Sequence, residues 1–284
     1  MVEGLSFRPA SVEDADTIDG IATSAFGPSE HRLSEIRRYL TLEPNYWLLA
    51  TIQGDPVGVV GATDYGSFAY LGMMTVRREF QRKGTGGALF RRELEWLEEL
   101  GLHRLRLDAT EDGFPVYSRA GFEVFDEAVM FELSEPLVFG DIPDDVRVLK
   151  EEDLGILAEF DRPVFGGDRK QLFCALLQDF PGRAFASHDT SGDMTGFLFV
   201  QHKRIGPWVA QSPDDAEALL RSALALPFRG SPVAVALGLN PSSGELLDRF
   251  GFKPGRGSRH MQRGIPSIPG DRTCIYGQTS FAVG

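Results

Sequence analysis

The stretch MTVRREFQRKGTGGALFRRELEWL, residues 74–97, decides how the chain is organised. An apolar run ends at residue 76 and a basic segment follows, after which three glycines stand within four positions, at Gly84, Gly86 and Gly87. Beyond the glycines, apolar residues recur at the spacing of an amphipathic helix. The stretch therefore predicts a strand, a glycine-rich turn and a long helix.

The glycine-rich turn has the properties of an anion site. The first N–H groups of a helix have no backbone partners and carry the positive end of the helix dipole. Glycines remove the Cβ atoms that would keep a ligand away from these N–H groups. Arg82 and Lys83 add positive charge beside them. A phosphate or a pyrophosphate is the fitting occupant.

Three phosphate-binding motifs have to be told apart at this turn. The nucleotide-binding P-loop ends in GK[ST], and no lysine followed by Ser or Thr closes this stretch. The dinucleotide fingerprint needs GxGxxG, whereas the glycines here are spaced as GxGG. The pattern that fits is Q/RxxGxG/A, with Gln81, Gly84 and Gly86 at its fixed positions.

The whole block resembles the acetyl-CoA signature of the GNAT N-acetyltransferases. The later YSRAGF, residues 117–122, resembles the Tyr-x-x-x-Gly-Phe segment that closes the same domain. The resemblance covers about residues 5–133. It implies an enzyme, an acyltransferase that moves an acetyl group from acetyl-CoA, its cosubstrate, directly to an amine. It implies no metal.

The resemblance also assigns roles to residues of the turn and of the preceding strand. The turn backbone holds the pyrophosphate of CoA, and the strand pairs with the pantetheine arm as an added strand pairs with a sheet edge. Thr110 is the last residue of LRLDAT (105–110) and stands where such domains often carry a polar residue near the pantetheine. The implied cofactor-binding residues are Met74, Thr75, Val76, Gln81, Arg82, Lys83, Gly84, Thr85, Gly86, Gly87 and Thr110.

Tyr117 is the implied catalytic residue. The leaving group is a thiolate whose acid has a pKa near 8.5, and a tyrosine hydroxyl has a pKa of about 10. A positioned tyrosine therefore donates a hydrogen bond or a proton to the departing sulfur. The alternative is that Tyr117 is a half-buried packing residue.

No general base can be named from the sequence. Some family members carry a glutamate on the strand before the glycines, but SFAYLGMM, residues 67–74, contains no acid. Asp64, Tyr65 and Asp126 are weak candidates that are more typical of turn or surface positions. A water relay is an equally open interpretation.

The chain repeats one pattern in two halves. LSFRPASVEDADTIDGIATSAFG (5–27) and DVRVLKEEDLGILAEFDRPVFGG (145–167) each predict a strand and then a helix with an acidic start. Gly121 and Gly251 each stand at a predicted helix end before a strand. Such repetition indicates a duplication.

We therefore expect an α/β (α+β) protein of two GNAT-like domains, residues 1–135 and 144–284, with a junction around 133–145. Each domain should contain a mixed, mostly antiparallel sheet flanked by helices.

The second half departs from the first at the glycine turn. VAQSPDDAEALLRSAL, residues 209–224, has no glycine there and carries acidic residues where an anion would bind. Leu247 stands at the position of the tyrosine. This half resembles the degenerate C-terminal domain of tandem GNAT-like proteins. We expect it to bind no CoA and to form a wall of the acceptor site.

Composition narrows the function classes. The formal net charge of −12 argues against a nucleic-acid partner, which usually meets a basic face. No segment approaches the ~18 apolar residues of a membrane helix. The two cysteines and five histidines show no metal-ligand spacing, and the cytoplasm is the expected compartment.

Several questions stay open at this point. A small-molecule amine is the expected acceptor, and a monomer and a homodimer are both compatible with the sequence. A rival interpretation is a non-catalytic acyl-CoA sensor or interaction protein, which needs the glycine turn but not Tyr117. Another is a transferase that uses a longer acyl-CoA ester.

Overall fold

The structure is a computed structural model that describes residues 2–29, 31–134, 143–264 and 270–284. Most of the predicted junction, residues 135–142, lies outside the described residues. The first half consists of β1 (Leu5–Pro9), α1 (Ala15–Phe26), α2 (Arg32–Leu40), β2 (Asn45–Ile52), β3 (Asp55–Asp64), β4 (Ala69–Val76), α3 (Thr85–Glu99), β5 (Leu105–Ala109), α4 (Phe114–Arg119) and β6 (Glu123–Glu132).

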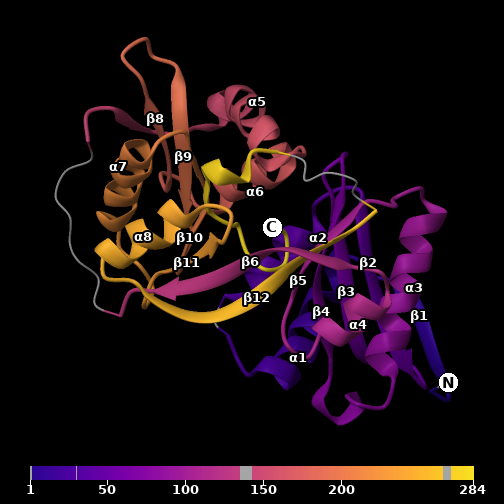
Figure 1. Cartoon of the computed structure of the whole chain (residues 1–284). Helices are drawn as coiled ribbons and strands as arrows, with labels where there is room; N and C mark the ends of the chain where they lie inside the picture. Colours follow the sequence, from indigo (N-terminus) through magenta and orange to yellow (C-terminus); the bar gives the residue numbers. More distant parts are fainter. Residues whose placement is uncertain (1, 30, 135–142, 265–269) are drawn as a thin grey trace.

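The second half repeats this order of elements and adds a short strand at its end (Figure 1). It consists of β7 (Val146–Val148), α5 (Leu154–Phe165), α6 (Lys170–Asp179), β8 (Ala184–His188), β9 (Met194–Val200), β10 (Arg204–Ala210), α7 (Pro213–Leu224), β11 (Val233–Leu237), α8 (Pro241–Arg249), β12 (Lys253–Arg263) and β13 (Ile275–Gly277).

The strands of both halves form one sheet, in the order β1-β2-β3-β4-β5-β12-β6-β11-β10-β9-β8-β7, with β13 paired to β10. Most pairs are antiparallel, while β4–β5 and β10–β11 are parallel, so the predicted fold class is confirmed.

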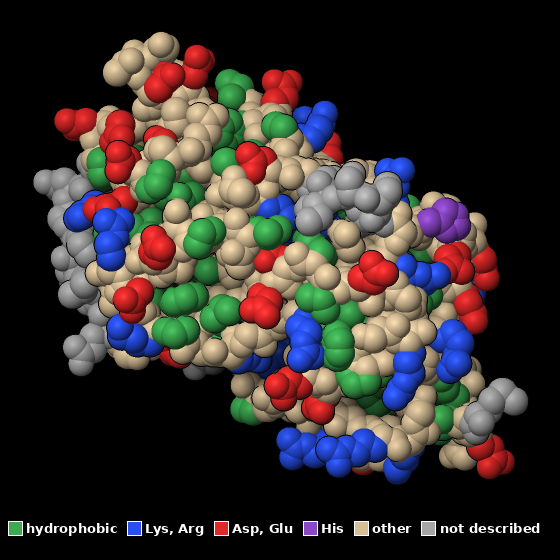
Figure 2. Space-filling view, in the orientation of Figure 1, with side chains coloured by type: hydrophobic (Ala, Val, Ile, Leu, Met, Phe, Trp, Pro, Cys, Tyr) green, Lys and Arg blue, Asp and Glu red, His purple; other side chains and the backbone are tan. Residues whose placement is uncertain are grey.

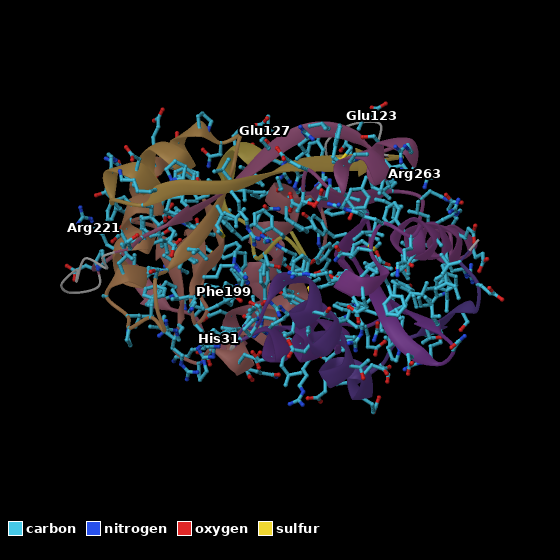
Figure 3. All side chains as sticks on the ribbon, turned by 90° about the horizontal axis from the view of Figure 1, so that it is seen from below. His31, Glu123, Glu127, Phe199, Arg221 and Arg263 are labelled. Carbon is cyan, nitrogen blue, oxygen red and sulfur yellow. The ribbon has the colours of Figure 1, made fainter. Side chains whose placement is uncertain are left out.

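The halves exchange a strand. β12 of the second half pairs with β5 of the first, with His260 opposite Asp108. β6 of the first half pairs with β11 of the second, with Met130 opposite Val235. The two long strands β6 and β12 run side by side from one half to the other (Figures 1 and 3). Each half is therefore completed by a strand of its neighbour.

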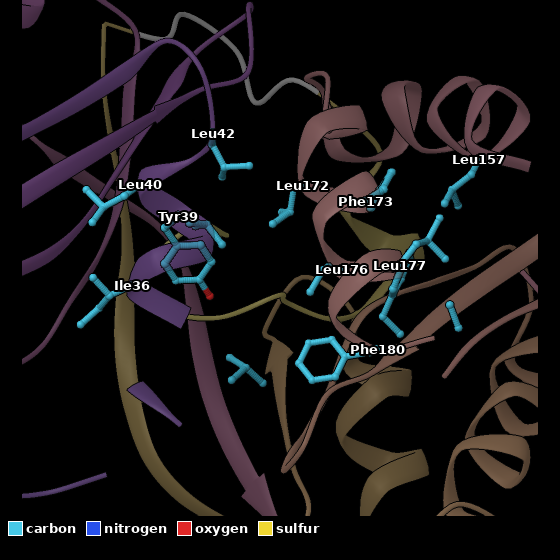
Figure 4. Packing of buried hydrophobic residues seen from close by; sticks show 14 of the residues in the cluster. Ile36, Tyr39, Leu40, Leu42, Leu157, Leu172, Phe173, Leu176, Leu177 and Phe180 are labelled. Carbon is cyan, nitrogen blue, oxygen red and sulfur yellow. The ribbon is translucent and has the colours of Figure 1, made fainter. Parts of the chain in front are cut away.

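Helices cover the two faces of each half. α3 and α4 pack their apolar residues on one face of the first half, and α7 and α8 do the same on the second. The other four helices meet between the halves, where Leu42, just after α2, points toward Leu172 of α6 (Figure 4). This shared core makes the two halves one packed body.

Ion pairs also join the halves. Arg38 of α2 places Nε 2.6 Å from a carboxylate oxygen of Asp179, at the end of α6. Glu35 of α2 pairs with Arg204 of β10 at 2.9 Å.

Among the described residues, no helix has the length and apolar character to cross a bilayer.

Two glycines show why the sequence repeats at its helix ends. Gly121 has φ of 83° and Gly251 has φ of 84°, a left-handed conformation that glycine adopts without strain. The phenylalanine after each glycine is buried: Phe122 in the core under α3, and Phe252 in the core under α7. The predicted glycine-terminated helix before a strand is confirmed in both halves.

Candidate functional site

Strands β4 and β5 form a fork. They pair in parallel only as far as Leu71 opposite Leu107. Between Gly72 and Thr75, β4 contains one residue more than its antiparallel neighbour β3, and Met73 in this bulge has φ of 52°. A bulge bends the strand that contains it, so the end of β4 turns away from β5.

The end of β4 is an open sheet edge. In the described part of the chain, no strand pairs with residues 73–76 on the side of β5. Unpaired N–H and C=O groups along such an edge are a template for an extended polar chain. Met74, Thr75 and Val76, the predicted pantetheine partners, all lie on this segment.

The corresponding fork of the second half is filled by the protein itself. β10 and β11 pair at Ile205 opposite Ala234 and then diverge. β13 enters there and pairs antiparallel with β10, with Gly277 opposite Trp208. Ser243 of α8 donates a hydrogen bond of 2.6 Å to the carbonyl oxygen of Tyr276 in β13. The second half therefore has no free strand edge at this position.

The predicted glycine turn leads from β4 into α3. Gly84 is the N-cap of α3 with φ of 88°, and Arg82 has φ of 59°, so the turn contains two left-handed residues. Gln81 Nε2 donates a hydrogen bond of 2.8 Å to the carbonyl oxygen of Val76 and ties the turn to β4. Within the described ranges, the backbone N–H groups of residues 82–87 find no acceptor.

The surroundings of the turn are open and basic. Arg82 and Lys83 are exposed, and Lys83 Nζ lies 5.7 Å from the ring centre of Phe80. Basic side chains gather at the lower edge of the molecule, below β4 and α3 (Figure 2). A turn that combines free N–H groups with nearby cations has the chemistry of a phosphate site.

The glycines after Gly84 differ in what surrounds them. A Cβ at Gly86 would lie 3.4 Å from Met74 Cε, an ordinary contact, whereas a Cβ at Gly87 would meet nothing within 4 Å. Thr85 between them is fully buried, and its hydroxyl has no hydrogen-bond partner among the described residues. The open side of the turn is therefore at Gly87.

Gly87→Ala should separate folding from anion binding. Alanine clashes with nothing there and should raise the free energy of unfolding by about 0.5 kcal/mol, because glycine weakens helices. The same methyl group would stand where phosphate oxygens approach the N–H groups, and we expect affinity for CoA to fall by about tenfold, or ~1.4 kcal/mol. Urea unfolding and calorimetry measure the two effects, and unchanged affinity would contradict this placement.

Tyr117 lies on α4 and is 8% exposed. Its ring packs against Phe90 of α3, with ring centres 4.8 Å apart, and against Phe122. Burial raises the pKa of Tyr117 to about 12. The hydroxyl thus stays protonated throughout the physiological range, as a hydrogen-bond donor must.

The remaining sequence candidates have local roles. Thr110 follows β5, and its hydroxyl accepts a hydrogen bond of 3.3 Å from Gly113 N before α4. Asp64 accepts one from Gly66 N in a turn, as predicted. Tyr65 lies in the turn between β3 and β4, as expected, although its side chain is buried. The expectation is wrong for Asp126, which is buried within β6. Tyr65 donates to the backbone of residue 283, and Asp126 accepts from the N–H of residue 239.

Sequence reasoning missed a buried polar cluster where the halves meet. Asp108 of β5 accepts hydrogen bonds from Tyr70 of β4, from Ser258 of β12 at 3.0 Å and from Gln278 at 3.2 Å. His260 Nδ1 lies 2.9 Å from Asp108 Oδ1. Burial opposes the charge on Asp108, but His260 and these hydrogen bonds outweigh it and lower the pKa of the carboxyl group. The available signal was the pair of charged residues, Arg106 and Asp108, that alternates with apolar residues in LRLDA, residues 105–109.

A cavity of about 350 Å³ lies between the halves, a volume typical of small-molecule sites. Its walls include Glu35 and Arg38 of α2 and Lys203 of the β9–β10 turn. The rings of His31 and His202, one from each half, lie 4.7 Å apart at this cavity. Figure 3 shows His31 between the two halves.

Comparison with known proteins points to one family. The sequence model described as Acetyltransferase (GNAT) family matches residues 15–122, and that described as Acetyltransferase (GNAT) domain matches residues 157–277. The uncharacterized N-acetyltransferase YitH of Bacillus subtilis (strain 168) is 24% identical over 188 residues. This match spans 64% of the chain and 66% of the length of YitH.

Solved structures share the architecture. A candidate acetyltransferase from Pyrococcus horikoshii is 28% identical, with a TM-score of 0.89 over 100% of this chain and 97% of that one. A tandem GNAT protein from the clavulanic acid biosynthesis pathway has a TM-score of 0.62 at 15% identity, over 93% of this chain and 99% of its own, and shows the fold alone. With two such domain models matched in succession, the chain belongs to the GNAT acetyltransferase family and carries its domain twice.

Proposed function

We propose that the first half binds acetyl-CoA and transfers its acetyl group directly to a small-molecule amine. The observation that carries this proposal is the open edge at the end of β4, which leads straight into a turn of unpaired N–H groups. An extended pantetheine followed by a pyrophosphate has the same order of hydrogen-bonding groups. The residues present therefore fit this cosubstrate.

The chain supplies binding and orientation, and acetyl-CoA supplies the reactive thioester. Residues 74–76 offer backbone hydrogen bonds along the strand edge, and residues 82–87 offer theirs to the phosphates. Tyr117 donates a hydrogen bond to the departing sulfur. With a pKa of about 12, well above the ~8.5 of a thiol, its hydroxyl stabilises the thiolate without giving up its proton outright.

The second half is proposed to bind no CoA and to wall the acceptor site. β13 occupies its fork, and Ser212 Oγ accepts a hydrogen bond of 3.1 Å from Asp215 N at the start of α7. In our proposal the N-terminus of α3 binds phosphate. The corresponding N-terminus of α7 is instead capped by its own serine side chain. The 350 Å³ cavity, lined by both halves, supports the role as a wall.

Tyr117→Phe tests the proposed hydrogen bond. The ring packing against Phe90 is retained, so stability and affinity for acetyl-CoA should change little. We expect kcat to fall by about a hundredfold, at the lower end of the range for removing one hydrogen-bond donor to a developing negative charge. Thiol release under saturating acetyl-CoA measures this. A rate equal to that of the wild type would leave Tyr117 as a packing residue.

The function itself is tested by thiol release from acetyl-CoA in the presence of polyamines, aminoglycosides and amino acids. Amine-dependent release establishes the transferase. Tight acetyl-CoA binding without release for any amine favours the sensor instead. Propionyl-CoA and octanoyl-CoA as donors test the preference for a longer acyl chain.

Both cysteines, Cys174 and Cys274, are free, which supports a reducing compartment such as the cytoplasm.

A further inference from the structure

We propose that His260, supplied by the second half, accepts the proton of the amine in the first half, and that Asp108 positions its ring. This inference rests on the proposed acetyl transfer. It assigns the general base that the sequence of β4 lacks, since that strand carries no acid from Ala69 to Val76. It also gives the exchanged strand β12 a role in the reaction.

The first argument is position. The last paired residues of the fork are Leu71 and Leu107, and Asp108 is the next residue of β5. His260 is the cross-strand partner of Asp108. The imidazole therefore stands at the level where β4 and β5 diverge, the place from which the open edge of β4 begins.

The second argument is orientation. Asp108 is an ionised carboxylate and can only accept, so Nδ1 of His260 must carry the proton of their 2.9 Å hydrogen bond. Nε2 is then unprotonated, with its lone pair free. It is buried and has no hydrogen-bond partner among the residues that the structure describes. A histidine held in this way is a base with a fixed direction.

The third argument is the small cavity beside the ring. His260 lines a cavity of about 10 Å³, which is room for one water molecule. Arg272 and Gln278 line the same cavity, and Nη2 of Arg272 and Oε1 of Gln278 likewise lack partners in the described ranges. One bound water would serve all these groups and carry a proton to Nε2 from an amine at the fork.

Burial and two nearby arginines keep the ring of His260 neutral. Burial lowers the pKa of His260 most, Arg272 and Arg106 lower it further, and Asp108 opposes them. Because the pKa lies below the usual 6.5, the unprotonated, active form persists to a lower pH than for an exposed histidine. The ionisable side chains that line the cavity or contact the ring of His260 are Tyr70, Arg106, Asp108, Arg169 and Arg272. Two of these arginines have carboxylate partners: Asp126 lies 3.5 Å from Arg272, and Asp161 is paired with Arg169.

The proton and electron balance is as follows in this proposal. An ammonium acceptor gives one proton to Nε2 through the water and becomes a neutral amine. Its lone pair forms the bond to the carbonyl carbon, and the C–S bond breaks with its electron pair on sulfur. The second N–H proton passes to sulfur, and His260 releases the first to solvent. The products are an amide, a thiol and one proton.

The tautomer can be read without any acceptor. In ¹⁵N-histidine NMR spectra, with His260 assigned by the loss of its signals in His260→Gln, we expect Nδ1 to be protonated and Nε2 to resonate as an unprotonated nitrogen at pH 7. Asp108→Asn should remove this preference. A protonated Nε2 in the wild type would overturn the proposal.

The proposed base is tested with two acceptors. Ethylamine is an ammonium ion at pH 7, whereas methoxyamine is uncharged at that pH. His260→Gln should slow the acetylation of ethylamine by about a hundredfold and remove the acidic limb from the pH profile of its kcat/KM. The rate of acetylation of methoxyamine should fall far less, because this amine has no proton to lose before attack. The surface variant His103→Gln should react like the wild type. Equal losses for both amines would indicate a structural role and overturn the proposal. Failure of the wild type with both would instead count against acetyl transfer.

Discussion

Gly86→Glu is expected to abolish acetyl-CoA binding while the protein stays folded. A Cβ at this position makes an ordinary 3.4 Å contact with Met74, so the turn tolerates a side chain. A carboxylate in the first turn of α3 is stabilised by the helix dipole and occupies the N–H groups itself. It also repels the pyrophosphate, and like charges at this range cost several kcal/mol, at least about a hundredfold in Kd.

Calorimetry with acetyl-CoA measures this effect, and the chain offers a matched control. Gly155 is the second residue of α5, as Gly86 is of α3, and a Cβ there meets nothing within 4 Å. Gly155→Glu makes the same charge change in the second half and should bind acetyl-CoA like the wild type. Wild-type affinity in Gly86→Glu would place the pyrophosphate elsewhere. No binding to the wild type would remove both the enzyme and the sensor.

Cutting the chain between its halves is expected to prevent either piece from folding alone. Residues 1–134 would lack β12, and residues 143–284 would lack β6, although each of these strands lies inside the sheet. The core shared by α1, α2, α5 and α6 would be exposed in both pieces. A typical domain is stabilised by only about 5–15 kcal/mol, so we expect the loss of an interior strand and of this core to unfold each piece.

Circular dichroism during urea unfolding tests this expectation. Each piece alone should show no cooperative transition, and the two co-expressed should regain one with a midpoint near that of the intact chain. A first piece that unfolds cooperatively at the wild-type midpoint would contradict a structural need for the exchanged strand. Tests of which half binds CoA therefore belong in the intact chain, where Gly86→Glu and Gly155→Glu can be compared.

The sequence predicted the parts of the site that depend on local chemistry. Gln81, Gly84 and Gly86 fix a turn whose conformation follows from neighbouring residues, and the structure has that turn between a strand and a helix. The fold class and the family followed from the same stretch and are confirmed. The contacts of residues 74–76, 82–87, Thr110 and Tyr117 with the cosubstrate stay predictions.

What the sequence did not predict depends on contacts between distant segments. β6 and β12 both begin after a Gly-Phe pair, and the alternation within a strand says which face it buries but not which strand it joins. The exchange was therefore missed. His260 was counted only among the histidines without metal-ligand spacing, because its partner Asp108 lies 152 positions away. Asp126 was misplaced for the same reason, since its partners are residues 239 and 272.

Because of strand β13, the occupancy of the two forks should depend differently on the concentration of cofactor. As part of the same chain, β13 meets β10 at an effective concentration in the millimolar range or above, whatever the supply of cofactor. Among the described residues, no strand pairs in this way with the end of β4. The occupancy of the fork at β4 should rise and fall with the level of free acyl-CoA. In our proposal, duplication has left one half whose fork is always filled by its own strand and one half whose fork fills according to the supply of acyl-CoA.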